Sequence, residues 1–294
     1  MTSNLRVALL GICSIYLAMQ PVPALTQQRP PPPPSDSAES VRKASQIDIA
    51  YVEPRNAKYR EIHQRVKEMH VLETLQEFLA PLRLPDKLMV KVDECGGAMT
   101  VPYKSQAPVT ICYEYIALIE ANIPSEPFVF FGRERPILTK GQAIIGPFIQ
   151  LVLQQVAFAV FDTLQIPIWG RLDEAADNIG AFIVLEFGDD IAWTTIAGSA
   201  WFLAQRGFYG AGYFSDAVRP LEAQRFYNYL CIAYGGWPAK FGFLVDSFNL
   251  NKERAKFCNQ DYRRLRRSFR QTIMPHVDRE LLKVVQAKKD WLPK

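Results

Sequence analysis

Residues 144–177 read IIGPFIQLVLQQVAFAVFDTLQIPIWGRLDEAAD, and this stretch decides the fold. Its first part, residues 144–161, contains no charge and is typical of a helix that is buried on all sides at a domain centre. A membrane-spanning helix is the alternative, but Gly146-Pro147 and three glutamines interrupt the apolar run. Residues 172–187 predict a second helix, whose acidic first turn, Asp173-Glu174, complements the helix dipole.

The flanking sequence predicts further helices and a small sheet. Residues 57–80 have apolar side chains at helical spacing and predict one amphipathic helix. More helices are expected at about residues 193–205, 221–234, 239–247 and 260–274. Three short apolar runs predict strands at residues 88–92, 100–103 and 109–113. The expected fold class is therefore α+β, mainly helical, with a small N-terminal β-sheet.

The N-terminus has the features of a secretory signal peptide. One cation in residues 1–6 precedes an apolar stretch, residues 7–19, and Val22-Pro23-Ala24 places small residues where a signal peptidase cleaves. An uncleaved N-terminal anchor is the alternative. Prolines 30–34 favour an extended polyproline II linker. We therefore expect a signal peptide at residues 1–24, a proline-rich linker at 25–40, a domain at 41–294 and a periplasmic or secreted location.

Four cysteines follow the predicted signal peptide, namely Cys95, Cys112, Cys231 and Cys258. An even number of cysteines in an exported chain indicates two disulfides, although four cysteines permit three pairings. Pairing of sequence neighbours gives Cys95–Cys112 and Cys231–Cys258. Metal binding by the same four residues is the rival interpretation, but the chain contains no Cys-x-x-Cys pair to support it.

Several motifs surround the two-helix stretch in a fixed order. The apolar run is followed by Asp162, Pro167, Gly170-Arg171, Asp173-Glu174 and Ala175-Ala176-Asp177. Cys95-Gly96-Gly97 and residues 109–114 lie upstream, and residues 224–231 and Cys258 lie downstream. In these blocks, over roughly residues 88–276, the chain resembles a bacterial family of putative metallopeptidases of otherwise unknown function. The resemblance implies a zincin-like (gluzincin-like) domain, in which His-Glu-Leu-Gly-His on the first helix binds zinc and an acid of the second helix completes the site.

The zinc motif of that family is missing from this chain. Counting back from Asp162, the motif falls on Gln154-Gln155-Val156-Ala157-Phe158. The Gln154 amide is a poor zinc ligand, Phe158 has no lone pair, and Gln155 cannot accept a proton from water as a glutamate can. The histidines of the chain lie elsewhere, at His63, His70 and His276, and residues 216–219 replace the family's Asp-x-His element. We therefore expect no catalytic residue, cofactor or metal ligand, and only the acidic remnants Asp173, Glu174 and Asp177.

Two functional hypotheses follow. The first is a non-catalytic pseudopeptidase of the cell envelope, which binds a protein or peptide in the remnant cleft. The second is a metal-dependent hydrolase with a rebuilt carboxylate site that uses Ca²⁺ or Mg²⁺ and is drawn from Asp162, Asp173, Glu174 and Asp177. The second hypothesis requires these acids to converge in a solvent-accessible pocket. Otherwise they have structural roles, with Asp177 paired to Arg171.

The positive charge of the chain is concentrated near its C-terminus. The net charge is +4, and residues 251–294 hold thirteen Lys and Arg against five Asp and Glu. One predicted helix carries five arginines, Arg263, Arg264, Arg266, Arg267 and Arg270, beside an apolar stripe of Tyr262, Leu265, Phe269 and Ile273. Such a helix can contact an anionic envelope surface, or it packs by its stripe and leaves a solvated cationic face. Nucleic acid is not expected as a partner of an exported protein.

Overall fold

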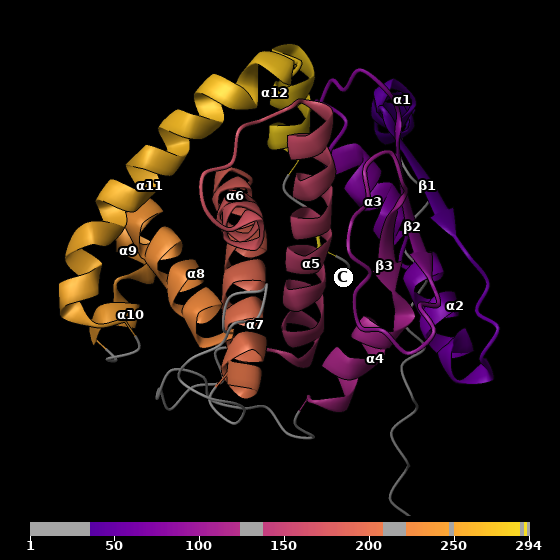
Figure 1. Ribbon diagram of the computed structural model, residues 1–294, viewed down its shortest axis with the longest axis horizontal. Helices are drawn as coiled ribbons and strands as arrows, with labels where there is room; N and C mark the ends of the chain where they lie inside the picture. Colours follow the sequence, from indigo (N-terminus) through magenta and orange to yellow (C-terminus); the bar gives the residue numbers. More distant parts are fainter. Residues whose placement is uncertain (1–35, 124–137, 208–221, 247–249, 289–290, 293–294) are drawn as a thin grey trace, which may run out of the picture. The chain divides into compact units, whose positions relative to one another are not determined.

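The computed structural model describes residues 36–123, 138–207, 222–246, 250–288 and 291–292, all within the unit Pro31–Lys294 (Figure 1). The predicted signal peptide and residues 216–219 lie outside the described residues. Helix α1, Asp36–Ala44, begins before residue 41, where we expected the domain to start. The last residues of the predicted linker are therefore helical.

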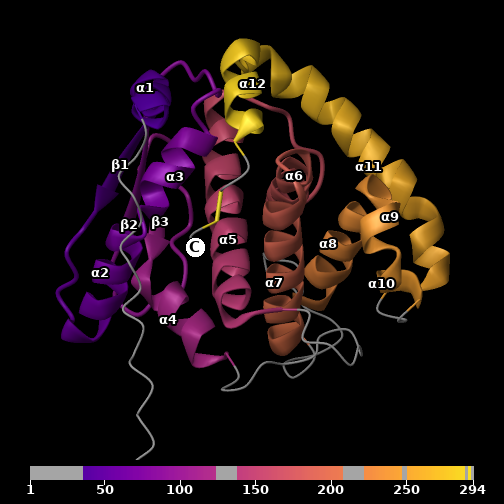
Figure 2. The same ribbon diagram turned by 180° about the vertical axis from the view of Figure 1, so that it is seen from behind.

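Helix α5, Lys140–Thr163, lies between the sheet and the other long helices (Figures 1 and 2). A capping box starts it, because the Thr139 side chain accepts from the Gln142 backbone and the Gln142 side chain bonds back to the Thr139 backbone. By length and composition α5 would also suit a membrane span, yet 83% of its most apolar window is buried inside the protein. It packs against α6, Leu172–Glu186, and α7, Asp189–Gly207, and also against α4, Tyr113–Ala121.

Three parallel strands form the sheet in the order β1-β2-β3. They are β1, Ile47–Tyr51, β2, Leu88–Asp93, and β3, Val109–Cys112, with Ile49 opposite Val90 and Val92 opposite Ile111. Parallel neighbours need a long crossover, which the helices after β1 provide for β2. Residues 94–108 make the second crossover without a helix, and the disulfide Cys95–Cys112 closes it.

Two strand assignments differ from the sequence-based ones. The predicted strand at residues 100–103 is wrong, because this segment runs through the β2–β3 crossover without strand pairing. Its Pro102 lacks an N–H to donate, and Val101 is 36% exposed. Strand β1 is absent from the prediction, although Ile47, Ile49 and Tyr51 alternate with polar or small residues as a strand does.

The single helix predicted over residues 57–80 is also wrong. The structure has a 3₁₀ turn, Ala57–Tyr59, then α2, Arg60–Glu68, and a separate α3, Val71–Phe78. The break lies at His70, whose φ of 51° is left-handed. The Tyr51 hydroxyl of β1 accepts from the Leu72 backbone N–H at 2.7 Å and donates to Glu73 at 2.7 Å. A contact with the sheet thus caps the start of α3, which the local sequence does not reveal.

The C-terminal half is helical throughout its described part. It comprises α8, Glu222–Gly236, α9, Pro238–Phe241, α10, Phe243–Asp246, α11, Lys252–Thr272, a 3₁₀ turn, Met274–His276, and α12, Arg279–Ala287. The Cys231–Cys258 disulfide joins α8 to α11. Gly235 lets these helices approach, because a Cβ there would lie 2.1 Å from the Cys258 carbonyl oxygen. The mainly helical fold with one small sheet confirms the predicted α+β class. The two disulfides confirm the predicted pairing of sequence neighbours.

Helices α5 and α7 come into backbone contact at a pair of glycines. A Cβ on Gly146 would lie 2.3 Å from the Thr194 carbonyl oxygen, and one on Gly198 would lie 2.5 Å from the Gln142 carbonyl oxygen. Neither obstacle is a flexible side chain, so an added methyl group has to move a helix. The α5–α7 packing therefore requires glycine at both positions.

We predict that Gly146→Ala lowers the free energy of unfolding by about 1–3 kcal/mol, the usual cost of overpacking. Gly141→Ala is the matched control on the same helix, because its nearest atom, the Thr139 hydroxyl oxygen, is 3.9 Å away. The control is expected to leave stability unchanged or to raise it by up to about 1 kcal/mol. Urea denaturation measures both, and equal midpoints for the two variants would contradict the proposed contact.

We also predict that Cys231→Ala/Cys258→Ala costs about 3–4 kcal/mol, because the bridge spans a sequence separation of 27 residues and constrains the unfolded chain. The measurement is urea denaturation of the double variant against the oxidised parent. Dithiothreitol added to the parent reduces both disulfides and should therefore produce a loss at least as large. An unchanged denaturation midpoint in the double variant would show that packing alone holds α11 on α8.

Candidate functional site

The positions of the missing zinc motif lie inside the protein. Gln154, Gln155 and Phe158 on α5 are 4%, 3% and 7% exposed, and Gln150, one turn earlier, is 2% exposed. Residues four apart lie on one face of a helix, so Gln150, Gln154 and Phe158 share a face of α5. The two glutamines of this face are polar side chains in an otherwise apolar helix, and each requires a hydrogen-bonding partner.

Asp177 of α6 is that partner, and it is 2% exposed. Its Oδ1 accepts from Gln150 Nε2 at 2.7 Å and from Gln154 Nε2 at 2.9 Å. Arg225 of α8 donates from Nε to Oδ2 at 2.6 Å and from Nη2 to Oδ1 at 3.1 Å. Both carboxylate oxygens are thus engaged, and a guanidinium whose side chain is only 12% exposed neutralises the charge. We call these four residues the Asp177 network.

The expected pairing of Asp177 with Arg171 is wrong. Arg171 is the exposed N-cap residue of α6, whereas Arg225 reaches Asp177 from 48 residues further along the chain. Sequence reasoning assigned no role to Gln150 or Arg225. The spacing of Gln150 and Gln154 is a usable signal for a shared face, but nothing local marks Arg225 as the partner of Asp177.

Neighbouring polar groups add no further charge to this site. Tyr229 of α8 is 1% exposed, and its burial, followed by the nearby Asp177 carboxylate, raises the pKa of the phenol well above its ordinary value. The phenol therefore stays neutral. Gln155 Nε2 has no hydrogen-bond partner within the described part of the chain. At the position where the resemblance implies a general base, the chain therefore places a buried neutral amide.

Among the described residues, the other acidic candidates form no group of three metal-ligand side chains with Asp177. Asp173 and Glu174 are half-buried in the first turn of α6, and Asp162 accepts a hydrogen bond from the Tyr103 hydroxyl at 3.3 Å. Among the described residues, one group of three metal-ligand side chains lies close enough to share an ion, namely Cys95, Cys112 and Glu114. Both of its sulfurs form a disulfide, and its carboxylate accepts from the backbone N–H groups of Cys95 and Gly97.

The three histidines are dispersed over separate elements. His63 Nδ1 lies 2.8 Å from the Tyr113 hydroxyl oxygen, which itself donates to the Val52 carbonyl. His70 occupies the break between α2 and α3, and His276 lies in the 3₁₀ turn before α12. None belongs to α5 or α6, so no imidazole of the chain stands in for the two that the resemblance implies.

Zinc does not fit the residues at the motif positions. A catalytic zinc site in a peptidase takes three protein ligands with available lone pairs. Phe158 offers none, and the amide groups of Gln150 and Gln154 are directed at Asp177 as donors. Asp177 itself is neutralised by Arg225. The arrangement is a closed hydrogen-bond network, and every charged member of it has a protein partner.

Residues 51–273 of the chain match the protein family described as "Putative metallopeptidase". The chain belongs to this family. The match runs from the end of β1 to just beyond α11 and so includes the Asp177 network and both disulfides. No curated protein and no solved structure matches the chain.

Membership in this family gives the Asp177 network a chemical meaning. In the zinc site that the resemblance implies, an acid of the second helix binds the ion directly. Gln154, where the resemblance places the first histidine, donates an amide N–H to Asp177 at 2.9 Å. The amide of Gln154 thus engages the acid of the second helix as a donor and has no metal-binding ring nitrogen.

The basic helix α11 packs by its apolar stripe. The Tyr262 and Phe269 rings lie 5.5 and 4.9 Å from the Phe182 ring of α6, and Ile273 is buried. Burial, with the adjacent Glu186 carboxylate, raises the pKa of Tyr262 to about 12, so its hydroxyl stays protonated and donates to Glu186 at 2.9 Å. The five arginines that the sequence places on this helix are all exposed, so they form a solvated cationic face.

We predict that Arg225→Met costs about 3–5 kcal/mol of unfolding free energy, because it leaves the buried Asp177 carboxylate without a counter-charge. Arg254→Met is the matched control, since Arg254 is exposed and donates to the Asn228 side chain. Its expected effect is within about 0.5 kcal/mol. Denaturation of Asp177→Asn/Arg225→Met completes the cycle and should show a loss well below the sum of the single losses. Additive losses would mean that the pair is not coupled.

Proposed function

We propose that this chain is a non-catalytic member of its family, a pseudopeptidase that acts by binding and not by cleavage. The observation that carries the proposal is the Asp177 network. The carboxylate of the second helix is bound to Arg225 and to the amides of Gln150 and Gln154. A zinc ligand has to present a free lone pair to the ion, and these oxygens are directed at cations and donors of the protein itself.

The proposed compartment is the periplasm or the exterior of the cell. Two disulfides are typical of proteins that fold in an oxidising environment. The signal-peptide pattern of residues 1–24 supports the same location. We further propose that the chain recognises a protein or peptide. Contact of the α11 arginines with an anionic envelope surface also stays a prediction.

The alternative hydrolase requires acids that converge in an accessible pocket. Asp177 is buried and paired with an arginine, which is the arrangement expected of a structural acid. Asp162 bonds to Tyr103 and forms no three-ligand group with other described acids. No observation on these residues favours the rebuilt carboxylate site over the non-catalytic proposal.

The test is the metal content of the exported chain, purified without chelators and with both disulfides intact. We predict substoichiometric zinc by elemental mass spectrometry, and no peptide cleavage that a chelator abolishes. Asp177→Asn is the control, because removal of the carboxylate should change neither readout if Asp177 binds no metal. One tightly bound metal ion per chain, lost in Asp177→Asn together with chelator-sensitive cleavage, would refute the proposal.

A further inference from the structure

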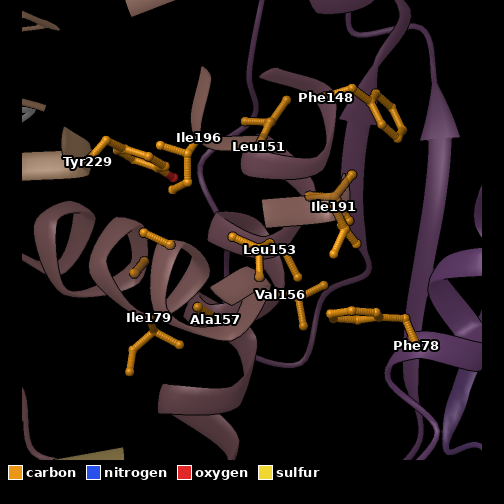
Figure 3. Packing of buried hydrophobic residues seen from close by; sticks show 14 of the residues in the cluster. Phe78, Phe148, Leu151, Leu153, Val156, Ala157, Ile179, Ile191, Ile196 and Tyr229 are labelled. Carbon is orange, nitrogen blue, oxygen red and sulfur yellow. The ribbon is translucent and has the colours of Figure 1, made fainter. Parts of the chain in front are cut away.

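An apolar cavity of about 230 Å³ lies beside α5, on the side of the helix next to Gln150 and Gln154. Leu153, Val156 and Ala157 of α5 line it, together with residues of α6, α11, α12 and the end of α3. Figure 3 shows Val156 directed toward Phe78 and Ile179 beside Ala157. Empty apolar cavities of roughly 150 Å³ already bind benzene-sized molecules. The space is therefore large enough for a hydrocarbon ligand.

The charged groups of the cavity are confined to its mouth. Arg266 and Arg270 lie four residues apart on α11 and are exposed, as are Glu186 and Gln286. Glu186 accepts a hydrogen bond from the Tyr262 hydroxyl at 2.9 Å. Within the described residues, neither arginine forms an ion pair. Two guanidinium groups against one carboxylate give the mouth a net positive charge beside apolar walls.

We propose that this cavity binds a monomeric fatty acid, with its alkyl chain against α5 and its carboxylate at Arg266 and Arg270. Guanidinium groups recognise carboxylates through paired, charge-assisted hydrogen bonds. The apolar walls exclude a peptide, whose backbone N–H and C=O groups would be left without partners. The cavity is recessed between helices and open at one side, which suits one inserted chain better than a flat lipid surface. This inference is independent of the non-catalytic proposal, since it uses other residues.

The cavity size predicts a preferred chain length. At roughly 30 Å³ for each water-sized group, about eight methylene groups fill the space. Each methylene that leaves water tightens binding about fourfold. Affinity should therefore rise from hexanoate to decanoate by about fourfold per carbon and then level off at dodecanoate.

Isothermal titration calorimetry tests the predicted dependence of affinity on chain length. The sample is the delipidated chain without its predicted signal peptide and with both disulfides intact, and the ligands are hexanoate, octanoate, decanoate and dodecanoate below their micelle concentrations. Arg266→Gln/Arg270→Gln should weaken decanoate binding about tenfold or more and leave decan-1-ol binding unchanged. The control, Arg263→Gln/Arg267→Gln, removes the same charge from the same helix at positions that do not line the cavity. It should bind decanoate like the parent.

Filling the cavity gives a second, independent readout. Ala157→Phe and, separately, Ile183→Trp should each abolish binding of both decanoate and decan-1-ol, with folding checked by circular dichroism. The proposal is overturned if both folded variants still bind decanoate, or if both arginine pairs weaken it equally. It is also overturned if affinity does not depend on chain length, or if the chain binds phosphatidylglycerol vesicles but not decanoate.

Discussion

The buried carboxylate of Asp177 is the constraint on which the helical half of this protein depends. A carboxylate that is 2% exposed has lost its hydration, and only matched donors offset that loss. The donors come from two other helices, α5 through Gln150 and Gln154, and α8 through Arg225. The position of each helix is therefore fixed by a shared charge. The Cys231–Cys258 disulfide then extends this arrangement to α11, whose stripe closes against α6.

The same constraint shows how a buried acid is accommodated beside the glutamines at the motif positions. In the zinc site that the resemblance implies, an acid of the second helix binds the ion, and the metal balances part of its charge. Without the ion, a lone buried acid would destabilise the fold. Arg225 supplies a positive charge, and Gln154 supplies a hydrogen-bond donor. Removal of the acid alone would take away the carboxylate that accepts from Gln150, Gln154 and Arg225 together, so the network acts as a unit.

The sequence predicts the elements that depend on local pattern and misses those set by distant contacts. The uncharged run of α5 and the acidic start of α6 identify both helices, and the family blocks locate the replaced motif. The break at His70 depends on the Tyr51 hydroxyl, and the partner of Asp177 comes from another helix, so no local rule predicts either. The strand expected at residues 100–103 failed for a similar reason, since parallel β2 and β3 require that segment as a crossover.

Two neighbouring faces of α5 are under different constraints. Gln150 and Gln154 meet the Asp177 charge, whereas Leu153, Val156 and Ala157 line the apolar cavity. Side chains on the first face are held by hydrogen bonds that tolerate little change, because an unpaired buried donor is costly. Those on the second face need only stay apolar and leave space open. If the chain is non-catalytic, as we propose, the hydrogen bonds of the first face place no demand on the second, and the proposed binding cavity can persist there.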